Sequence, residues 1–218
     1  MITSIDQLDF SKVYTYADYL TWRFKERVEL IAGRIFRRSP GPSRRHQRIS
    51  FEISRQLANY LLNQKCEAFA APFDVRLIED NAAGVSEIVN TVQPDLCVVC
   101  DLSKLDTKGC LGSPDFIIEI LSPASATRDI KYKFDLYQRF KVKEYWVLDP
   151  YRQIVQMNVL KEDGKYQSIR PYVYDTPLAS TSIKGFSLDL STIFDDDPDE
   201  ASILKEVEEF YQKRTPIS

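Results

Sequence analysis

Two runs of apolar residues stand at the centre of the chain, at positions 116–121 and 144–148. Unbroken apolar runs of this length are typical of strands buried on both faces of a sheet. Asp129 lies between them, where it can cap a helix, so the pattern predicts a strand–helix–strand unit. Glu119 interrupts the first run. A carboxylate inside a buried strand costs several kcal/mol unless a cation or a metal compensates it, so we expect a functional site at Glu119.

The flanking patterns predict a mixed α/β protein. Helices are expected at 14–22, where Thr15 can serve as the cap, at 46–62 and at 201–213. Strands are expected at 68–69, 73–78 and 94–100, and hairpins at 27–37 and 154–173. Residues 79–91 are interpreted as a polar loop and 195–200 as an acidic break. This order predicts an α/β/α sandwich around a mixed β-sheet, with an N-terminal helix and hairpin and a C-terminal hairpin and helix.

Composition narrows the functional classes. With 218 residues, 44% of them hydrophobic, the chain suits one domain over 1–198 with its core at about 46–150, followed by a helical tail at 199–218. The formal net charge of −3 gives no global electrostatic reason to bind nucleic acid, so such binding would need a local basic patch. No apolar run approaches membrane-spanning length, and the first ten residues lack the pattern of a signal peptide. We therefore expect a cytoplasmic protein without a membrane partner.

The four cysteines do not resemble a disulfide framework. Cys97 and Cys100 form a CxxC pair inside an expected strand, where residues three apart point to opposite faces and cannot chelate one zinc ion. His46 is the only histidine. Reduced core thiols are therefore the favoured interpretation.

Glu119 has two candidate acidic partners. Asp115 lies four residues away on the same expected strand, about 13 Å along it, which is too far for two short side chains to share one ion. Asp95 stands at the mouth of another buried strand, and neighbouring strands are only about 4.8 Å apart. Two carboxylates with backbone carbonyls and waters suit Mg²⁺ or Mn²⁺. Asp95 and Glu119 are therefore the candidate metal ligands. Asp95 as a simple turn residue after Pro94, and Glu119 paired only with a lysine, remain open.

These residues resemble a known family. A Pro-Asp pair before one strand, an acidic residue within the next, and then a helix and a strand resemble the PD-(D/E)XK nuclease superfamily. The segments EILSPAS, RDIKYKFDLY and KEYWVLDP resemble its restriction-endonuclease-like branch of bacterial proteins, and so do the VELIAGRIF hairpin and the loop ending at His46. The resemblance spans about residues 14–190. It implies a restriction endonuclease-like fold, a magnesium-dependent endonuclease (a hydrolase), and metal-binding positions at Asp95 and Glu119.

The chain departs from the superfamily at the catalytic lysine. That lysine belongs two residues after the glutamate, and Leu121 stands there. The resemblance implies that the lysine has moved to the following helix. On a helical wheel Lys133 falls inside the apolar arc and Lys131 on the polar side. The apolar arc consists of Ile130, Tyr132, Phe134, Leu136, Tyr137 and Phe140. Lys133 is therefore the candidate catalytic cation, with snorkelling past the aromatic residues as the alternative.

Two further residues are candidates for supporting roles. His46 falls on the inward face of its helix, where it serves either packing or the site. Glu29 matches the pattern of the restriction-endonuclease-like branch. The sequence does not decide which side of the hairpin it faces.

Three functions from different classes follow. The first is a metal-dependent endonuclease acting on DNA. The second is a catalytically decayed nuclease fold that binds nucleic acid or protein. The third is a structural dimer subunit using aromatic residues of the C-terminal hairpin, and a homodimer is the expected assembly.

Overall fold

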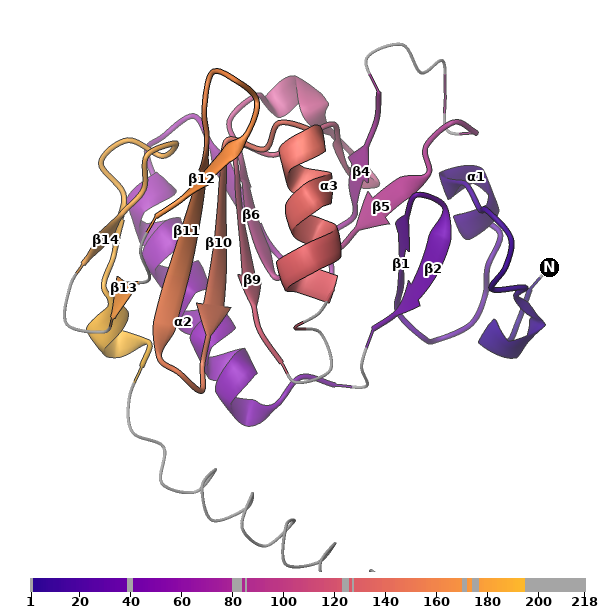
Figure 1. Cartoon of the computed structure of the whole chain (residues 1–218), viewed down its shortest axis with the longest axis horizontal. Helices are drawn as coiled ribbons and strands as arrows, with labels where there is room; N and C mark the ends of the chain where they lie inside the picture. The colour runs from indigo at the N-terminus through magenta and orange to yellow at the C-terminus, as the bar shows by residue number, and fades with distance from the viewer. Residues whose placement is uncertain are drawn as a thin grey trace, which may run out of the picture.

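The computed structural model describes residues 2–38, 41–79, 84, 86–122, 126, 128–169, 172–173 and 177–194. Within these ranges the chain forms two large mixed sheets and few helices (Figure 1). The predicted α/β fold class is confirmed. The predicted acidic break at 195–200 and the tail at 199–218 lie outside the described residues. No helix among the described residues is long and apolar enough to cross a membrane.

The larger sheet has seven strands and contains the predicted central unit. Its order is β12–β11–β10–β9–β6–β3, and β13 pairs with β11. The strands are β3 Glu67–Ala70, β6 Leu96–Val99, β9 Phe116–Ile120, β10 Glu144–Asp149, β11 Ile154–Leu160, β12 Tyr166–Ser168 and β13 Tyr172–Val173. Strands β9 and β10 are parallel and joined by the predicted crossover, whereas β6 runs antiparallel to β9.

Helix α2, Arg44–Leu61, covers one face of this sheet (Figure 1). Ser43 caps its N-terminus, because the Ser43 hydroxyl accepts a hydrogen bond from the backbone N–H of His46. Ile49, Ile53 and Leu57 are fully buried at helical spacing and pack on the sheet. Each such side chain stabilises the fold by about 1.5–3 kcal/mol through burial.

The opposite face is covered by a π-helical turn, η3 Arg128–Lys133, which continues into α3 Phe134–Arg139. A π-helix has more residues per turn than the wheel assumes. The prediction that Ile130 and Tyr132 face the sheet is therefore wrong, because they are 52% and 44% exposed. Asp129 lies within the first turn and is buried, so its predicted capping role is also wrong.

A second sheet packs beside α3, and the sequence pattern does not predict it as a unit. Its order is β2–β1–β5–β4–β8–β7. The strands are β1 Val28–Ile31, β2 Arg34–Arg37, β4 Val75–Leu77, β5 Asn90–Val92, β7 Leu105–Asp106 and β8 Gly109–Leu111. Strand β5 begins at Asn90, within the stretch 79–91 interpreted as a polar loop, and ends one residue beyond it. Val75 and Val92 share a buried cluster with Ile117 of β9, so this sheet lies against the α3 face of the larger one.

The hairpin β1–β2 turns at the predicted Ala32-Gly33. Gly33 has φ +70, and a Cβ there would lie 2.3 Å from Val13 Cγ1, so the turn requires glycine. The helix predicted at 14–22 is short, α1 Tyr16–Tyr19, and Thr15 caps it as expected. The remaining short elements are η1 Ile5–Gln7, η2 Leu102–Lys104, β14 Leu178–Ala179, β15 Ser187–Leu188 and η4 Leu190–Thr192.

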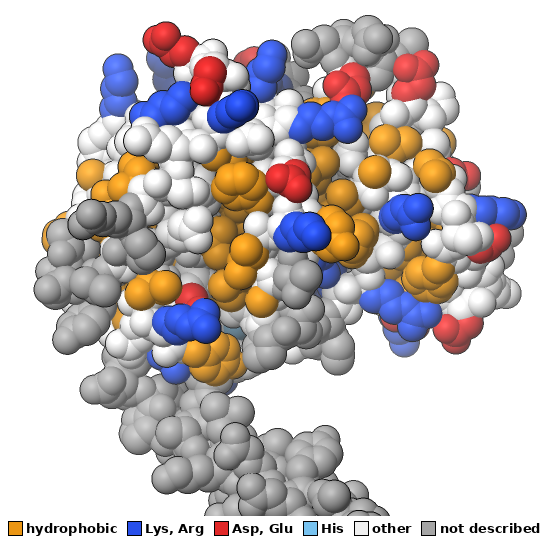
Figure 2. All heavy atoms as spheres, in the orientation of Figure 1, with side chains coloured by type: hydrophobic (Ala, Val, Ile, Leu, Met, Phe, Trp, Pro, Cys, Tyr) orange, Lys and Arg blue, Asp and Glu red, His pale blue; other side chains and the backbone are white. Residues whose placement is uncertain are grey.

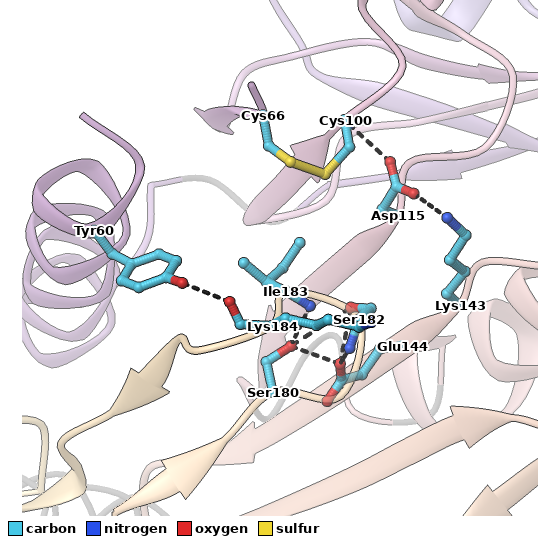
Figure 3. Close-up of a disulfide and its surroundings, with 10 residues drawn as sticks. All are labelled: Tyr60, Cys66, Cys100, Asp115, Lys143, Glu144, Ser180, Ser182, Ile183 and Lys184. Atoms are coloured by element: carbon cyan, nitrogen blue, oxygen red, sulfur yellow. Dashed lines mark hydrogen bonds and ion pairs between the residues drawn. A yellow bond between two sulfur atoms is a disulfide. The ribbon is translucent and has the colours of Figure 1, made fainter. Parts of the chain in front are cut away.

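The expectation of reduced thiols is wrong for two of the four cysteines. Cys66 and Cys100 form a disulfide, with their Cα atoms 4.0 Å apart (Figure 3). The register that pairs Glu67 with Val99 places residues 66 and 100 opposite each other just beyond the ladder. Cys97 and Cys110 are buried as free thiols.

Candidate active site

Asp95 and Glu119 lie opposite each other on neighbouring strands. Leu96 of β6 pairs with Ile118 of β9 in an antiparallel register, and continuing that register by one residue places Asp95 beside Glu119. Side chains of directly opposed residues share one face of the sheet, with Cβ atoms about 4.5–5.5 Å apart. Both residues are nearly inaccessible to solvent, at 4% and 1% exposure. The register therefore brings the two residues together on one face of the sheet.

Asp95 is held by three donors. Its Oδ1 lies 3.0 Å from Arg38 Nη2, and its Oδ2 lies 3.2 Å from His46 Nε2. The backbone N–H of Ile120 donates to Oδ2 at 2.9 Å. Burial alone would raise the pKa of Asp95, but the hydrogen bond and charge of His46, the charge of Arg38 and the N–H of Ile120 lower it to about 2. Asp95 is therefore an ionised, firmly oriented carboxylate.

Glu119 is held by Lys133 and Tyr137. Lys133 Nζ donates to Glu119 Oε1 at 2.7 Å, and the Tyr137 hydroxyl donates to the same oxygen at 2.8 Å. Burial raises the pKa of Glu119 to about 8, because desolvation outweighs the attraction of Lys133 and the nearby carboxylates add repulsion. Two donors on one oxygen fix the direction of the carboxyl group.

Glu29, on strand β1 of the second sheet, contacts the same lysine as Glu119. It is fully buried on β1, and its Oε1 lies 3.0 Å from Lys133 Nζ and accepts a 2.8 Å hydrogen bond from the backbone N–H of Gln93. Its Oε2 lies 3.4 Å from Arg128 Nε. Burial opposes ionisation of Glu29, but Lys133, Arg38 and Arg128 together lower its pKa. Lys133 therefore bridges β1 and β9.

Asp129 completes a buried charge cluster. Its Oδ1 lies 3.6 Å from Lys133 Nζ and 3.5 Å from Arg128 Nε. The π-helical turn places Asp129 and Lys133 on one buried face. Ile130 and Tyr132 of the same turn are exposed. Four carboxylates (Glu29, Asp95, Glu119, Asp129) thus face three cations (Arg38, Arg128, Lys133). Because the pKa of Glu119 is raised to about 8, the ionised acids and the cations of the cluster are close to balance near neutral pH.

A cleft of about 840 Å³ opens above this cluster. Its floor includes Arg38, His46, Asp95, Arg128 and Asp129, and its walls come from α2, the end of β3 and the loops before β1 and α2. Glu119 and Lys133 lie beneath this floor and do not line the cleft. The charged cluster is therefore reached from solvent through the Asp95 side.

The structure brings all five predicted site residues together: Glu29, His46, Asp95, Glu119 and Lys133. Leu121, where the superfamily lysine would stand, is buried in the apolar cluster instead. Lys131 is exposed, with its ammonium 5.9 Å from the Tyr132 ring.

Sequence reasoning missed four members of the site: Arg38, Arg128, Asp129 and Tyr137. The spacing of Asp129 and Lys133 was a usable signal, because residues four apart share a helix face. For Arg38 and Arg128 no local pattern distinguishes them from solvated arginines.

The donor set fits a hard divalent cation. Among the described residues no three His, Cys, Asp or Glu side chains form a ready-made metal-binding group. Mg²⁺, however, is commonly held by one or two carboxylates, with waters and substrate phosphates in the remaining positions. Asp95 and Glu119 carry oxygen atoms of the kind that such an ion takes.

Comparisons with known proteins identify relatives of this chain and a structure with the same fold. An uncharacterised protein of Synechocystis is 29% identical over 146 residues, which cover 65% of this chain and 77% of that protein. A second Synechocystis protein, also uncharacterised, is 28% identical over 122 residues, or 55% of this chain and 60% of its own. The crystal structure of a "putative nuclease belonging to DUF820" from Anabaena variabilis matches with a TM-score of 0.61 at 19% identity, covering 83% of this chain and 97% of that one. This last likeness concerns the fold.

The model of the Uma2 family, described as "Putative restriction endonuclease", matches residues 16–191. That range is well over half of the sequence and contains every residue of the buried charge cluster. The chain therefore belongs to the Uma2 family of restriction-endonuclease-like proteins.

Proposed function

We propose that this protein is a metal-dependent endonuclease that hydrolyses DNA phosphodiester bonds, with Asp95 and Glu119 binding Mg²⁺ or Mn²⁺. The observation that carries the proposal is the opposition of two buried carboxyl groups on adjacent strands, one of them in direct contact with Lys133, beneath an open cleft. Buried carboxyl groups with strongly shifted pKa values near a cleft are candidate functional groups, and here two strands and a lysine contribute to one such cluster.

Each residue has a distinct role in this proposal. A bound divalent ion would supply the positive charge that stabilises the reacting phosphodiester and would activate a water molecule. Asp95 is oriented toward the ion by His46 and by the Ile120 N–H. Lys133 holds Glu119 and keeps a full positive charge at the reaction centre, because the neighbouring carboxylates raise its pKa further. Glu29 anchors Lys133 from the opposite side.

The choice of DNA rests on the family and on the local charge of the site. On the face in Figure 2, basic and acidic side chains are intermixed, in keeping with a net charge of −3. Attraction for a polyanion would therefore come from the cleft, where Lys25, Arg27, Arg38 and Arg128 are among the lining residues. Such local binding depends strongly on salt. The expected homodimer and cytoplasmic location are part of the same proposal.

The direct test is cleavage of plasmid and oligonucleotide DNA at low salt with Mg²⁺ or Mn²⁺. Asp95→Asn and Glu119→Gln each replace a carboxyl group proposed to hold the ion by an amide of the same shape, and we expect both to abolish cleavage. Lys131→Ala is the matched control, because Lys131 is exposed and lies outside the cluster. Cleavage that persists in Glu119→Gln, or that needs no metal, would refute the assignment.

A second candidate function is a decayed nuclease fold that binds nucleic acid or protein. The absence of a lysine at Leu121 favours it, because the superfamily position is occupied by a buried apolar side chain. Metal and DNA binding without cleavage of any substrate would favour this alternative. The third alternative, a structural dimer subunit, needs exposed aromatic side chains on the C-terminal hairpin. Tyr166 of that hairpin is half-buried, with its ring 5.3 Å from Phe134 of the same chain, which speaks against this role.

A further inference from the structure

The groups proposed for catalysis lie too deep for an intact duplex to reach. Asp95 is 4% exposed, Glu119 is 1% exposed and Lys133 is fully buried. The cleft of about 840 Å³ gives a route toward them, and Asp95 lines it. Clefts of this size hold ligands comparable to a few nucleotides. A reacting phosphodiester has to enter the cleft, and a continuous double helix would be held at its rim.

The walls of the cleft carry two exposed aromatic side chains. Phe51 is 74% exposed on α2, where its neighbours along the cleft are polar residues: Gln47, Ser50 and Ser54. Tyr151, in the turn after β10, is 45% exposed and lines the same cleft. The Arg45 guanidinium lies 5.8 Å from the Tyr151 ring. Aromatic rings on the walls of a polar cleft are typical stacking platforms for unpaired bases.

The rim supplies charge of the sign that a nucleic-acid strand requires. Lys25 and Arg27, in the loop before β1, are exposed and line the cleft together with the exposed Glu26. Arg38 and Arg128 also line it, and each is ion-paired with buried carboxylates. Exposed cations beside aromatic platforms form the two components of single-strand binding sites, one for the backbone and one for the bases. This complementarity distinguishes a nucleic-acid strand from an apolar protein segment as the occupant.

We propose that the cleft accepts one unpaired DNA strand, so that the substrate is single-stranded DNA or the unpaired part of a junction. In this arrangement Phe51 and Tyr151 stack on bases, and the strand's phosphates follow Lys25 and Arg27 down to Asp95. The inference rests on the proposed nuclease function and adds to it the class of substrate.

The test measures binding and cleavage separately. Fluorescein-labelled oligonucleotides of one mixed sequence are prepared as a single strand, as a blunt duplex and as a fork with unpaired arms. Binding is followed by fluorescence anisotropy with Ca²⁺ in place of Mg²⁺. We expect the single strand and the fork to bind at least about tenfold more tightly than the duplex, since stacking on two rings is lost in the duplex.

Substitutions locate the binding to the cleft. Phe51→Ala and Tyr151→Ala should each weaken single-strand binding by about five- to a hundredfold and leave duplex binding unchanged. Phe51→Leu retains apolar bulk without a ring and should behave like Phe51→Ala, whereas Tyr151→Phe should bind like the wild type. Leu62→Ala is the matched control, because Leu62 is 80% exposed at the end of α2 and does not line the cleft. Circular dichroism of each variant confirms folding.

The outcomes separate this inference from the proposed function. Metal-dependent cleavage of duplex alone, or equal binding of duplex and single strand, would overturn the inference and leave the nuclease in place. Preferential single-strand binding that Phe51→Ala abolishes, without cleavage of any substrate, would support the inference and refute the nuclease. If Phe51→Ala instead dissolves a dimer seen by light scattering and leaves single-strand binding unchanged, Phe51 belongs to an interface between copies and the inference fails.

Discussion

Lys133 Nζ lies 2.7 Å from Glu119 Oε1 and 3.0 Å from Glu29 Oε1, so one ammonium joins strands of the two sheets. All three side chains are at most 1% exposed. The ammonium compensates the buried charge of the two carboxylates, which solvent cannot do because water does not reach them. The position of Lys133 therefore governs both the stability of the interior and the geometry of the proposed site.

Replacing Lys133 should destabilise the fold strongly. Lys133→Met removes the cation and leaves Glu119, Glu29 and Asp129 to repel one another, which should lower the free energy of unfolding by about 3–5 kcal/mol. Urea denaturation measures this change. Lys131→Met is the control and should change stability by less than about 0.5 kcal/mol, because Lys131 is exposed. Equal effects of the two substitutions would show that the buried contact is unimportant.

Metal binding should stabilise the wild type and not the Glu119→Gln variant. A divalent ion bound only to the folded state raises the melting temperature by mass action. Glu119→Gln keeps the side-chain shape but removes the charged ligand, so the increase with Mn²⁺ should disappear. Glu79→Gln serves as the comparison, since Glu79 is exposed and pairs with Arg139 at 2.6 Å. A Mn²⁺-dependent increase that survives in Glu119→Gln would place the metal elsewhere.

Tyr137→Phe should loosen Glu119 without removing it. The substitution deletes one hydroxyl, the donor of the 2.8 Å hydrogen bond to Glu119 Oε1, and preserves the ring. We expect the free energy of unfolding to fall by at most about 3 kcal/mol. We also expect a higher Mn²⁺ concentration for half-maximal thermal stabilisation. Tyr145→Phe is the matched control, because the Tyr145 hydroxyl donates to the backbone carbonyl of Asp129 instead. The Mn²⁺ requirement of that variant should equal that of the wild type.

The Cys66–Cys100 disulfide should stabilise the protein by about 2–4 kcal/mol, because it closes a loop with a sequence separation of 34 residues. The double substitution Cys66→Ser and Cys100→Ser removes it, and urea denaturation measures the loss. Treatment with dithiothreitol should lower the stability of the wild type to about that of the double variant, and should leave the variant unchanged. Non-reducing peptide mapping that finds Cys66 alkylated would contradict the pairing.

Glu52 should contribute a pH-dependent link between α2 and η4. A hydrogen bond from Arg55, with others from Gln56 and Thr192, lowers the pKa of Glu52 to about 2, below its ordinary value of 4.5. A carboxyl group with a lowered pKa stabilises the fold above its unfolded-state value and loses that contribution as the pH falls toward 2. Glu52→Gln should therefore reduce stability at neutral pH, by less than about 1 kcal/mol because its partner Arg55 is half-exposed and solvent screens the pair. The difference from the wild type should vanish between about pH 4.5 and pH 2 in thermal melts.

Local sequence pattern was sufficient for the elements that carry the site. The apolar runs of β9 and β10, the stripe of α2 and the glycine of the β1–β2 turn each depend on neighbouring residues, so their chemistry is readable along the chain. The carboxylates stand out for the same reason: Glu119 is an ionisable group inside an apolar run. Strand spacing then makes Asp95, and not Asp115, the partner that can reach Glu119.

Tertiary structure decided the rest, because the determining contacts join residues far apart in sequence. Strands β5, β7 and β8 of the second sheet have only two or three residues each, too few for a periodic pattern to predict them. The π-helical turn that buries Asp129 with Lys133 breaks the periodicity that a wheel assumes. Cys66 meets Cys100 through the β3–β6 register, and Arg38 meets Asp95 only after the two sheets pack. The sequence by itself singled out Asp95, Glu119 and Lys133 as charges in the interior, because each interrupts an apolar pattern. The packing of the sheets decided that Arg38 and Arg128 join them there, because those contacts span distant parts of the chain.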